Sequence, residues 1–200
     1  MLVTQSAPEW QISEWLNSPQ PLSLAALRGR VVALHAFQML CPGCVAHALP
    51  QVQRVRAVFA AQDVAVLGLH CVFEHHAAMT PVALRAFAHE YRLDYPIGID
   101  QADPPQPVPL TMQAYGLRGT PSLLLFDRQG RLRLNHFGQI EDLALGALLA
   151  QQLTEISRLL ADRDPASGMP PPDAALEPLL RQMAQLLADG FQNEHKSQDR

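Results

Sequence analysis

The feature that most constrains this 200-residue chain is a buried strand that runs directly into a Cys-x-x-Cys turn. Residues 31–39 are mostly apolar, and Cys41-Pro42-Gly43-Cys44 follows them. After the second cysteine, apolar residues recur at helical spacing as far as Phe59, which predicts a helix beginning near Cys44. We therefore expect the Cys41 sulfur beside the first turn of a helix, where free N–H groups and the helix dipole favour a thiolate.

The motif alone leaves three interpretations open. Cys44 can close a small disulfide with Cys41, which would make a reversible redox centre. Cys-x2-Cys is also the spacing of zinc knuckles, so the pair could be half of a metal site. The two cysteines could also be buried without a chemical role. Three cysteines in all do not make a structural disulfide framework.

Composition excludes several classes of protein. The formal net charge is −4 with no long basic run, so we expect no nucleic-acid partner. No apolar run approaches the ~18 residues of a membrane helix, so we expect no membrane association. The first residues lack the cationic and apolar parts of a signal peptide, and we expect a cytoplasmic location.

The remainder of the chain alternates between predicted strands and helices. A continuous apolar run over 63–69 indicates a central parallel strand, and Thr80-Pro81 then indicates a helix start. This strand–helix–strand–helix order predicts a right-handed crossover. The segment 1–30 is expected to precede the sheet, with Trp10 and Trp15 packed against the domain. The later predicted elements are a short edge-like strand at 95–99, a helix over 111–115 that stops at Gly116, a hairpin of 123–126 with 132–137, and a helix over 141–160.

The C-terminal part is expected to be separate from this domain, which we bound at 1–163 with a core of about 9–155. Residues 164–173 are rich in proline and predict a linker. Residues 174–189 carry one apolar stripe typical of an amphipathic helix, followed by a polar tail to 200. This helix either folds back on its own domain or forms a contact with a partner, including a homodimer.

The succession of strand, Cys-x-x-Cys helix, second βα unit, Thr120-Pro121, hairpin and final helix resembles the thioredoxin-like superfamily. It is most similar to the TlpA/ResA/DipZ-like branch and to the redoxin (AhpC/TSA-like) grouping, over about 9–155. Further matching stretches are Leu24 to Gly29, Tyr115 to Thr120 and Phe126 to Gly130. The resemblance implies an α/β thioredoxin-like fold, a central mixed sheet flanked by helices, here with a C-terminal helical extension.

The resemblance also implies roles for individual residues. Cys41 would be the exposed attacking thiol and Cys44 the resolving thiol. Pro121 would be a cis-proline facing the disulfide, and the Thr120 backbone would bind a substrate peptide; the alternative is an ordinary trans proline that opens a strand. The expected substrate-binding surface further includes Leu40, Pro42 and Gly43.

Several positions depart from the family pattern. Thioredoxins carry a buried acid six residues before the first cysteine, and His35 stands there, either as proton acceptor for Cys44 or as a satisfied core histidine. The helix proline, Pro50, comes nine residues after Cys41, one later than the commonest spacing. His70 and Glu74 follow the second strand and are candidate acid/base groups, although the plainer interpretation is a polar loop that caps the next helix. A zinc site made from the cysteines with His70 and His75 is a further alternative.

From these residues we expect a thiol–disulfide oxidoreductase that uses no cofactor or metal beyond the Cys41–Cys44 pair. Its substrate would be a disulfide-containing protein or a small thiol, and an external dithiol would supply electrons. The direction of the reaction is left open. One alternative is a peroxide-reducing redoxin with antioxidant activity, although Leu34 and Gln38 replace the residues of the peroxidatic frame. Another is a non-catalytic binding module.

Overall fold

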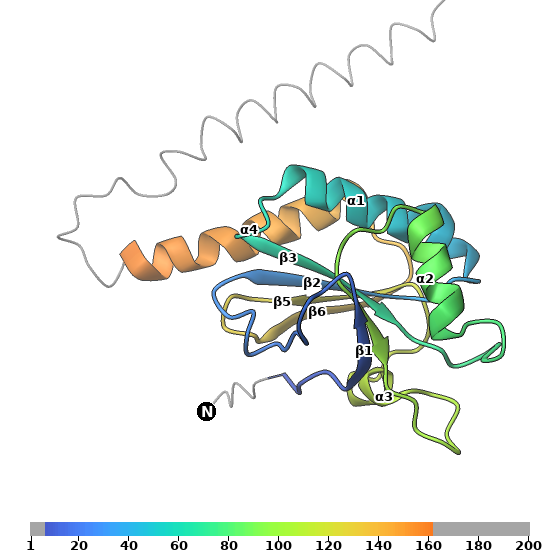
Figure 1. Ribbon diagram of the computed structural model, residues 1–200. Helices are drawn as coiled ribbons and strands as arrows, with labels where there is room; N and C mark the ends of the chain where they lie inside the picture. Colours follow the sequence, from blue (N-terminus) through green and yellow to red (C-terminus); the bar gives the residue numbers. More distant parts are fainter. Residues whose placement is uncertain (1–6, 162–200) are drawn as a thin grey trace, which may run out of the picture. The chain divides into compact units, whose positions relative to one another are not determined.

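A six-stranded mixed sheet with helices on both faces forms the described part of the protein, residues 7–161 of the computed structural model (Figure 1). The strands lie in the order β1-β4-β3-β2-β5-β6. The predicted linker at 164–173 and the helix at 174–189 lie outside the described residues. In chain order the elements are β1 (Ile12–Leu16), β2 (Val31–Phe37), η1 (Cys44–Ala48), α1 (Leu49–Val58), β3 (Val64–His70), α2 (Pro81–Glu90), β4 (Ile97–Asp100), α3 (Leu110–Ala114), β5 (Ser122–Phe126), β6 (Leu132–Phe137) and α4 (Asp142–Ala161).

The two central strands, β2 and β3, are buried along their whole length. Both consist almost wholly of apolar residues, as strands covered on two faces require. They pair in parallel, β3 pairs with β4 in parallel, and β2 pairs with β5 antiparallel. The predicted central parallel strands and the mixed sheet are therefore confirmed.

The N-terminal segment differs from the prediction because it contributes a strand. β1 pairs antiparallel with β4, with a register irregularity between Ile12 and Glu14. This strand occupies the edge of the sheet, so the expectation that residues 95–99 form an edge strand was wrong, and β4 is an internal strand. All four residues of β4 are buried as a result.

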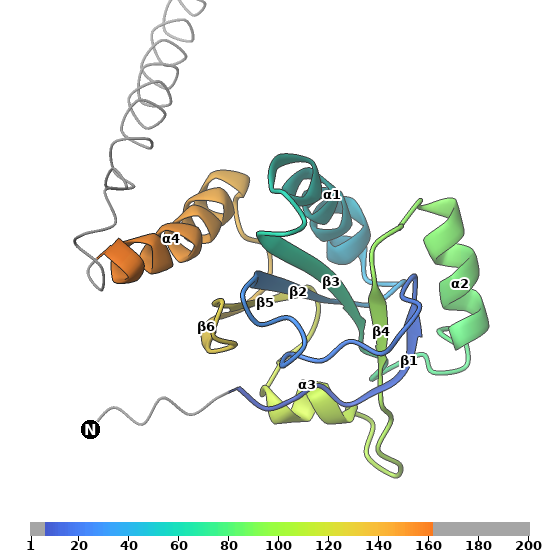
Figure 2. The same ribbon diagram turned by 60° about the vertical axis from the view of Figure 1, so that its left-hand side comes forward.

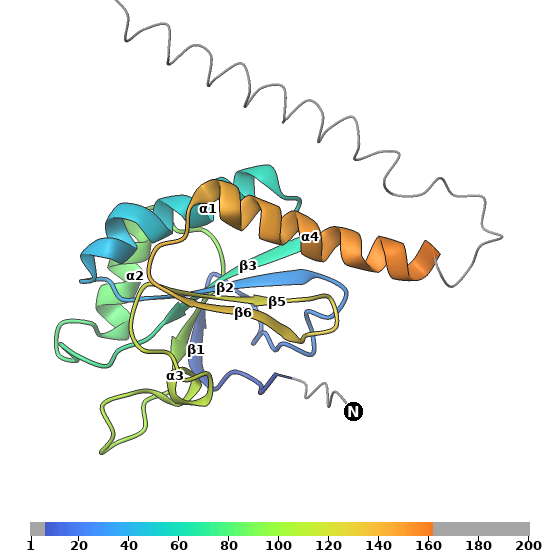
Figure 3. The same ribbon diagram turned by 180° about the vertical axis from the view of Figure 1, so that it is seen from behind.

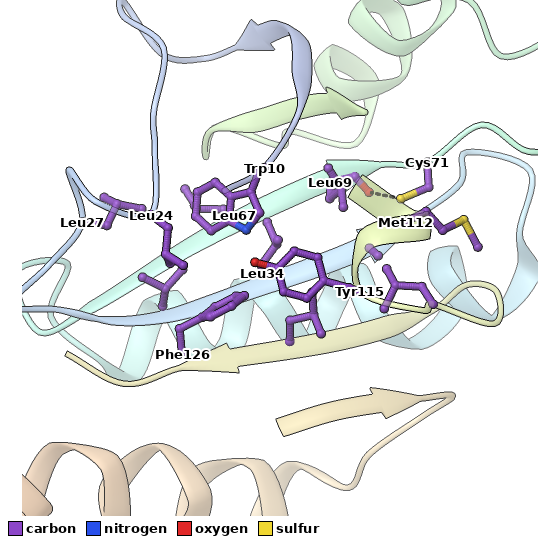
Figure 4. Close-up of a cluster of buried hydrophobic side chains, with 14 of the residues drawn as sticks. Trp10, Leu24, Leu27, Leu34, Leu67, Leu69, Cys71, Met112, Tyr115 and Phe126 are labelled. Carbon is purple, nitrogen blue, oxygen red and sulfur yellow. Dashed lines mark hydrogen bonds between the residues drawn. The ribbon is translucent and has the colours of Figure 1, made fainter. Parts of the chain in front are cut away.

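Alternate residues of β2 face opposite sides of the sheet. Val32, Leu34 and Ala36 point into a core cluster shared with α3 and with the segment before β2 (Figure 4). Trp10 belongs to this cluster and is 8% exposed, which confirms that it packs against the domain. Figure 2 shows α1 and the start of α4 on the opposite face of the sheet from α3.

The helix ends follow the predicted local signals. The Thr80 hydroxyl accepts a hydrogen bond from the Ala83 N–H at 3.2 Å, which caps α2 in front of Pro81. Gly116 follows α3 with a φ of +59°, a left-handed conformation that glycine adopts without steric cost. The predicted hairpin is formed by β5 and β6 (Figure 3). Within residues 7–161 no helix has both the length and the apolar character needed to span a membrane.

Candidate active site

Cys41 lies where β2 passes into the Cys-x-x-Cys helix, directly before the first helical residue, Pro42. Its thiol is partly exposed and is not in a disulfide. The Cys44 N–H donates to the Cys41 Sγ at 3.3 Å, which is the bond that an N-cap side chain receives from the third helical residue. The Cys41 carbonyl also accepts from the N–H groups of Cys44 and Val45 at 3.0 and 3.1 Å. The sulfur therefore sits where the helix backbone can stabilise a thiolate.

Cys44 occupies a different environment, since it is fully buried. Burial raises the pKa of the Cys44 thiol to about 12, and a hydrogen bond and electrostatic repulsion from Cys41 act in the same direction. Hydrogen bonds with the Gln38 backbone and the Thr120 side chain lower the pKa, but by less than burial raises it. One thiol of the pair is thus reachable from solvent, while the other is buried and held in its protonated form.

A loop before β5 closes the site from the other side. The Cys41 thiol donates to the Thr120 carbonyl at 3.4 Å, and the Thr120–Pro121 peptide bond is cis. A Cβ placed on Gly43 would lie 3.4 Å from Cδ of Pro121, so the proline ring packs over the Cys-x-x-Cys turn. The structure thus brings together Cys41, Gly43, Thr120 and Pro121, which the family resemblance had placed in one site.

The helix after the cysteines contains an irregular turn. η1 is a five-residue π-helix, in which the Leu49 N–H bonds to the Cys44 carbonyl, and Pro50 stands at the start of α1. A π turn accommodates one residue more than an α turn, and such turns occur frequently at functional sites. It therefore accounts for the position of Pro50 one residue later than the commonest spacing.

His35 is buried beneath this helix, in the strand that leads to Cys41. Its ring stacks on Phe37 at 5.8 Å, and burial lowers its pKa to about 4 although the Ser122 backbone accepts a hydrogen bond from it. Its Nε2 has no hydrogen-bond partner among the described residues. No hydrogen bond joins His35 to Cys44 within residues 7–161. The role of His35 as proton acceptor for Cys44 therefore stays a prediction.

The two other candidate acid/base groups, His70 and Glu74, differ in their exposure to solvent. His70 is buried, contacts Phe37 with ring centroids 5.4 Å apart, and has its pKa lowered to about 4 by burial. Glu74, His75 and His76 are exposed. In the part of the chain that the structure describes, no three or more His, Cys, Asp or Glu side chains are grouped as a metal site. The described residues therefore provide no cluster of ligands for the alternative zinc site.

Cys71 is fully buried at the end of β3 and belongs to the core cluster (Figure 4). Its Sγ lies 3.7 Å from both the Leu69 carbonyl and Oδ2 of Asp100, and burial with the nearby Asp100 raises the thiol pKa. Asp100 accepts from the N–H groups of Thr111 and Met112 at 2.8 and 2.9 Å. The interpretation of Cys71 as a small buried side chain agrees with this packing.

The structure also reveals residues of the site that sequence reasoning had missed. Gln38 is buried, and its carbonyl accepts from the Cys41 N–H at 3.3 Å, which fixes the backbone before the turn. Ser122 donates to the Gly119 carbonyl at 2.7 Å and thereby ties the Pro121 loop together. Their proximity to Cys41 and Pro121 in the sequence was the available signal.

The fold and the paired thiols define a thioredoxin-like thiol–disulfide oxidoreductase. The Redoxin family model matches residues 2–144, and the chain belongs to the Redoxin family. No curated protein matches the chain.

Solved structures give the same fold. The crystal structure of a thioredoxin-like superfamily protein is 57% identical, with a TM-score of 0.73, and the match covers 74% of this chain and 96% of that one. A thiol-disulfide isomerase from Corynebacterium glutamicum is 46% identical, with a TM-score of 0.71 and coverage of 74% and 95%. A thioredoxin-like protein in its oxidised form is 24% identical, with a TM-score of 0.63 and coverage of 78% and 99%, a likeness of fold alone.

Proposed function

We propose that the chain exchanges electrons with protein disulfides through Cys41 and Cys44, with Cys41 attacking and Cys44 resolving. The observation that carries this proposal is the asymmetry of the two thiols. Cys41 is partly exposed at the start of the helix and accepts the Cys44 N–H, whereas Cys44 is fully buried with its pKa raised to about 12. A substrate disulfide can reach only the first of them.

In the first step the Cys41 thiolate attacks one sulfur of the substrate disulfide. A bond forms between Cys41 Sγ and that sulfur, the substrate S–S bond breaks, and the other substrate sulfur leaves as a thiolate that takes up a proton. The product is a mixed disulfide. The Cys44 N–H, which lies 3.3 Å from the Cys41 Sγ, stabilises negative charge on the thiolate before attack.

In the second step Cys44 loses its proton and attacks the Cys41 Sγ. The Cys41–Cys44 bond forms, the mixed disulfide breaks, and the released substrate thiolate takes up a proton. The substrate thus leaves with both sulfurs reduced, and the protein is oxidised by two electrons. The mixed disulfide removes the Cys41 thiol, one of the causes that raise the Cys44 pKa, so this step becomes easier once substrate is attached. An external dithiol returns the pair to its reduced form, and the reverse sequence oxidises a substrate dithiol.

Two further observations support a polypeptide as the substrate. Leu40 is 57% exposed beside Cys41, and Pro42 is exposed as well, so apolar surface surrounds the reactive sulfur. The 46% identical neighbour is a thiol-disulfide isomerase, a class of enzyme that acts on disulfides. We propose that Thr120 and Pro121 hold an extended substrate segment against Cys41.

The proposal is tested by trapping the mixed disulfide. A Cys44→Ser variant is expected to accumulate a covalent adduct with a disulfide-containing protein, detected as a dithiothreitol-sensitive mass increase at Cys41. Cys71→Ser is the matched control, since it removes a buried cysteine outside the pair and should turn over as the wild type does. Formation of the same adduct by Cys41→Ser through Cys44 would contradict the assigned roles.

A further inference from the structure

An exposed cation lies on an exposed aromatic ring at one edge of the proposed active site. The guanidinium carbon of Arg118 is 5.2 Å from the ring centroid of Phe137, and that phenylalanine is 45% exposed. A cation–π contact restricts a guanidinium without occupying its N–H groups with a carboxylate. The pair therefore presents a positioned donor group to solvent.

The backbone places this pair next to the residues that contact Cys41. Gly119 and Thr120 follow Arg118, and the Thr120 carbonyl accepts from the Cys41 thiol. On the other side, Phe137 is paired with Ser122, the residue directly after Pro121. A Cβ on Gly119 would lie 3.0 Å from the Phe137 ring, so the ring closes against the loop.

The charge of Arg118 is not neutralised within the described part of the chain. None of the salt bridges there involves Arg118, whereas carboxylates pair with Arg54, Arg56, Arg85, Arg128, Arg131 and Arg133. The turn before Cys41 is apolar near the sulfur, because Leu40 is exposed there. A substrate segment lying across Pro121 would thus meet apolar surface near Cys41 and a positive charge beyond it.

We propose that Arg118 is a specificity-determining residue, which favours polypeptide disulfides that carry an acidic residue close to the attacked cysteine. This inference rests on the proposed function. The substrate carboxylate pairs with the guanidinium, whose position is restricted by its contact with the Phe137 ring. Because the ion pair is exposed, it selects among substrates by a small factor and weakens with added salt.

The test uses three peptides with the same disulfide that differ only in a Glu, Gln or Lys two residues from the attacked cysteine. For the reduced wild-type protein at low salt we expect kcat/KM to fall from Glu to Gln to Lys, by about two- to five-fold at each step. Arg118→Gln should abolish this order and Arg118→Glu should reverse it. Phe137→Leu, which removes the ring under the guanidinium, should reduce the preference.

Arg30→Gln is the matched control. Arg30 precedes β2, at the opposite end of that strand from Cys41, and its Nη1 donates to the Ala61 carbonyl at 3.5 Å. This variant should keep the wild-type order. Equal rates for the Glu and Lys peptides with the wild type, or an unchanged order in Arg118→Gln, would overturn the proposal.

A second measurement separates this inference from the proposed function. The Cys41→Ser protein is titrated with the same peptides carrying Ser in place of Cys, and the Arg118 Nε–H signal is followed by NMR. Selective displacement of that signal by the Glu peptide supports charge selection even if no peptide is reduced. Identical responses to the Glu and Lys peptides overturn it even if every peptide is reduced.

Discussion

The raised pKa of Cys44 predicts a large difference in reactivity between the two thiols of the pair. At neutral pH the population of thiolate falls tenfold for each unit by which the pKa exceeds the pH. With its pKa raised from 9.0 to about 12, Cys44 should carry about a thousandfold less thiolate than an ordinary cysteine. Iodoacetamide at pH 7 should therefore label Cys41 once, and should label Cys44 only after unfolding in urea.

Replacing Cys41 tests which cause is dominant. Burial is the largest cause of the raised pKa, and the hydrogen bond and repulsion from Cys41 are smaller. Cys41→Ser should consequently accelerate labelling of Cys44 only modestly, with the rate still well below that of the urea-unfolded protein. Alkylation rates are read by mass spectrometry of peptides, with Cys71 as a buried internal control. Rapid labelling of Cys44 in folded wild-type protein at pH 7 would refute the reasoning.

Two further predictions concern stability. A Cβ on Gly68 would lie 3.1 Å from Ile97 and 3.2 Å from both Phe37 and Tyr95, so Gly68→Ala should cost about 1–3 kcal/mol in urea unfolding. Gly146→Ala in α4 is the control, because a Cβ there meets nothing within 4 Å beyond its chain neighbours and the nearby helix backbone. This variant should be neutral or stabilising. In the folded protein the pKa values of His35 and His70 are lowered from 6.5 to about 4. The unfolded chain therefore binds protons at a higher pH than the folded protein does, so the free energy of unfolding should fall as the pH drops from 6.5 to 4. The expected loss is up to about 3 kcal/mol for each histidine. Replacing both histidines with Gln should flatten that part of the pH profile, and an unchanged profile would show that they do not cause it.

The elements around the site were predictable because local signals and burial agree there. The apolar runs of β2 and β3 require cover on both faces, and Thr80-Pro81 is a helix start in sequence and in structure. The juxtaposition of Cys41 with Thr120 and Pro121 came from the family resemblance, since Cys41 and Thr120 are 79 positions apart and no local pattern links them.

The missed features have physical causes. β1 contains Ser13 and Glu14 with an irregular register, so its residues do not alternate cleanly between apolar and polar. Without β1, the 95–99 strand could only be placed at the edge of the sheet. The pattern of apolar residues does not reveal the π turn, because one extra residue in a turn rotates the helix face without changing the amino-acid composition of the helix. The cation–π contact of Arg118 with Phe137 depends on the hairpin register, which the sequence does not reveal.

The central claim is that Cys41 and Cys44 form a reversible disulfide, and the most direct test is mass spectrometry of the protein equilibrated across a glutathione redox series, with metal content recorded on the same sample. The account predicts a reversible loss of two hydrogens that maps to a Cys41–Cys44 bond, absent in Cys44→Ser and retained in Cys71→Ser. Its midpoint would show whether the pair favours reduction or oxidation of substrates. Thiols that never pair, together with one zinc per chain, would contradict the account and make the turn a metal site.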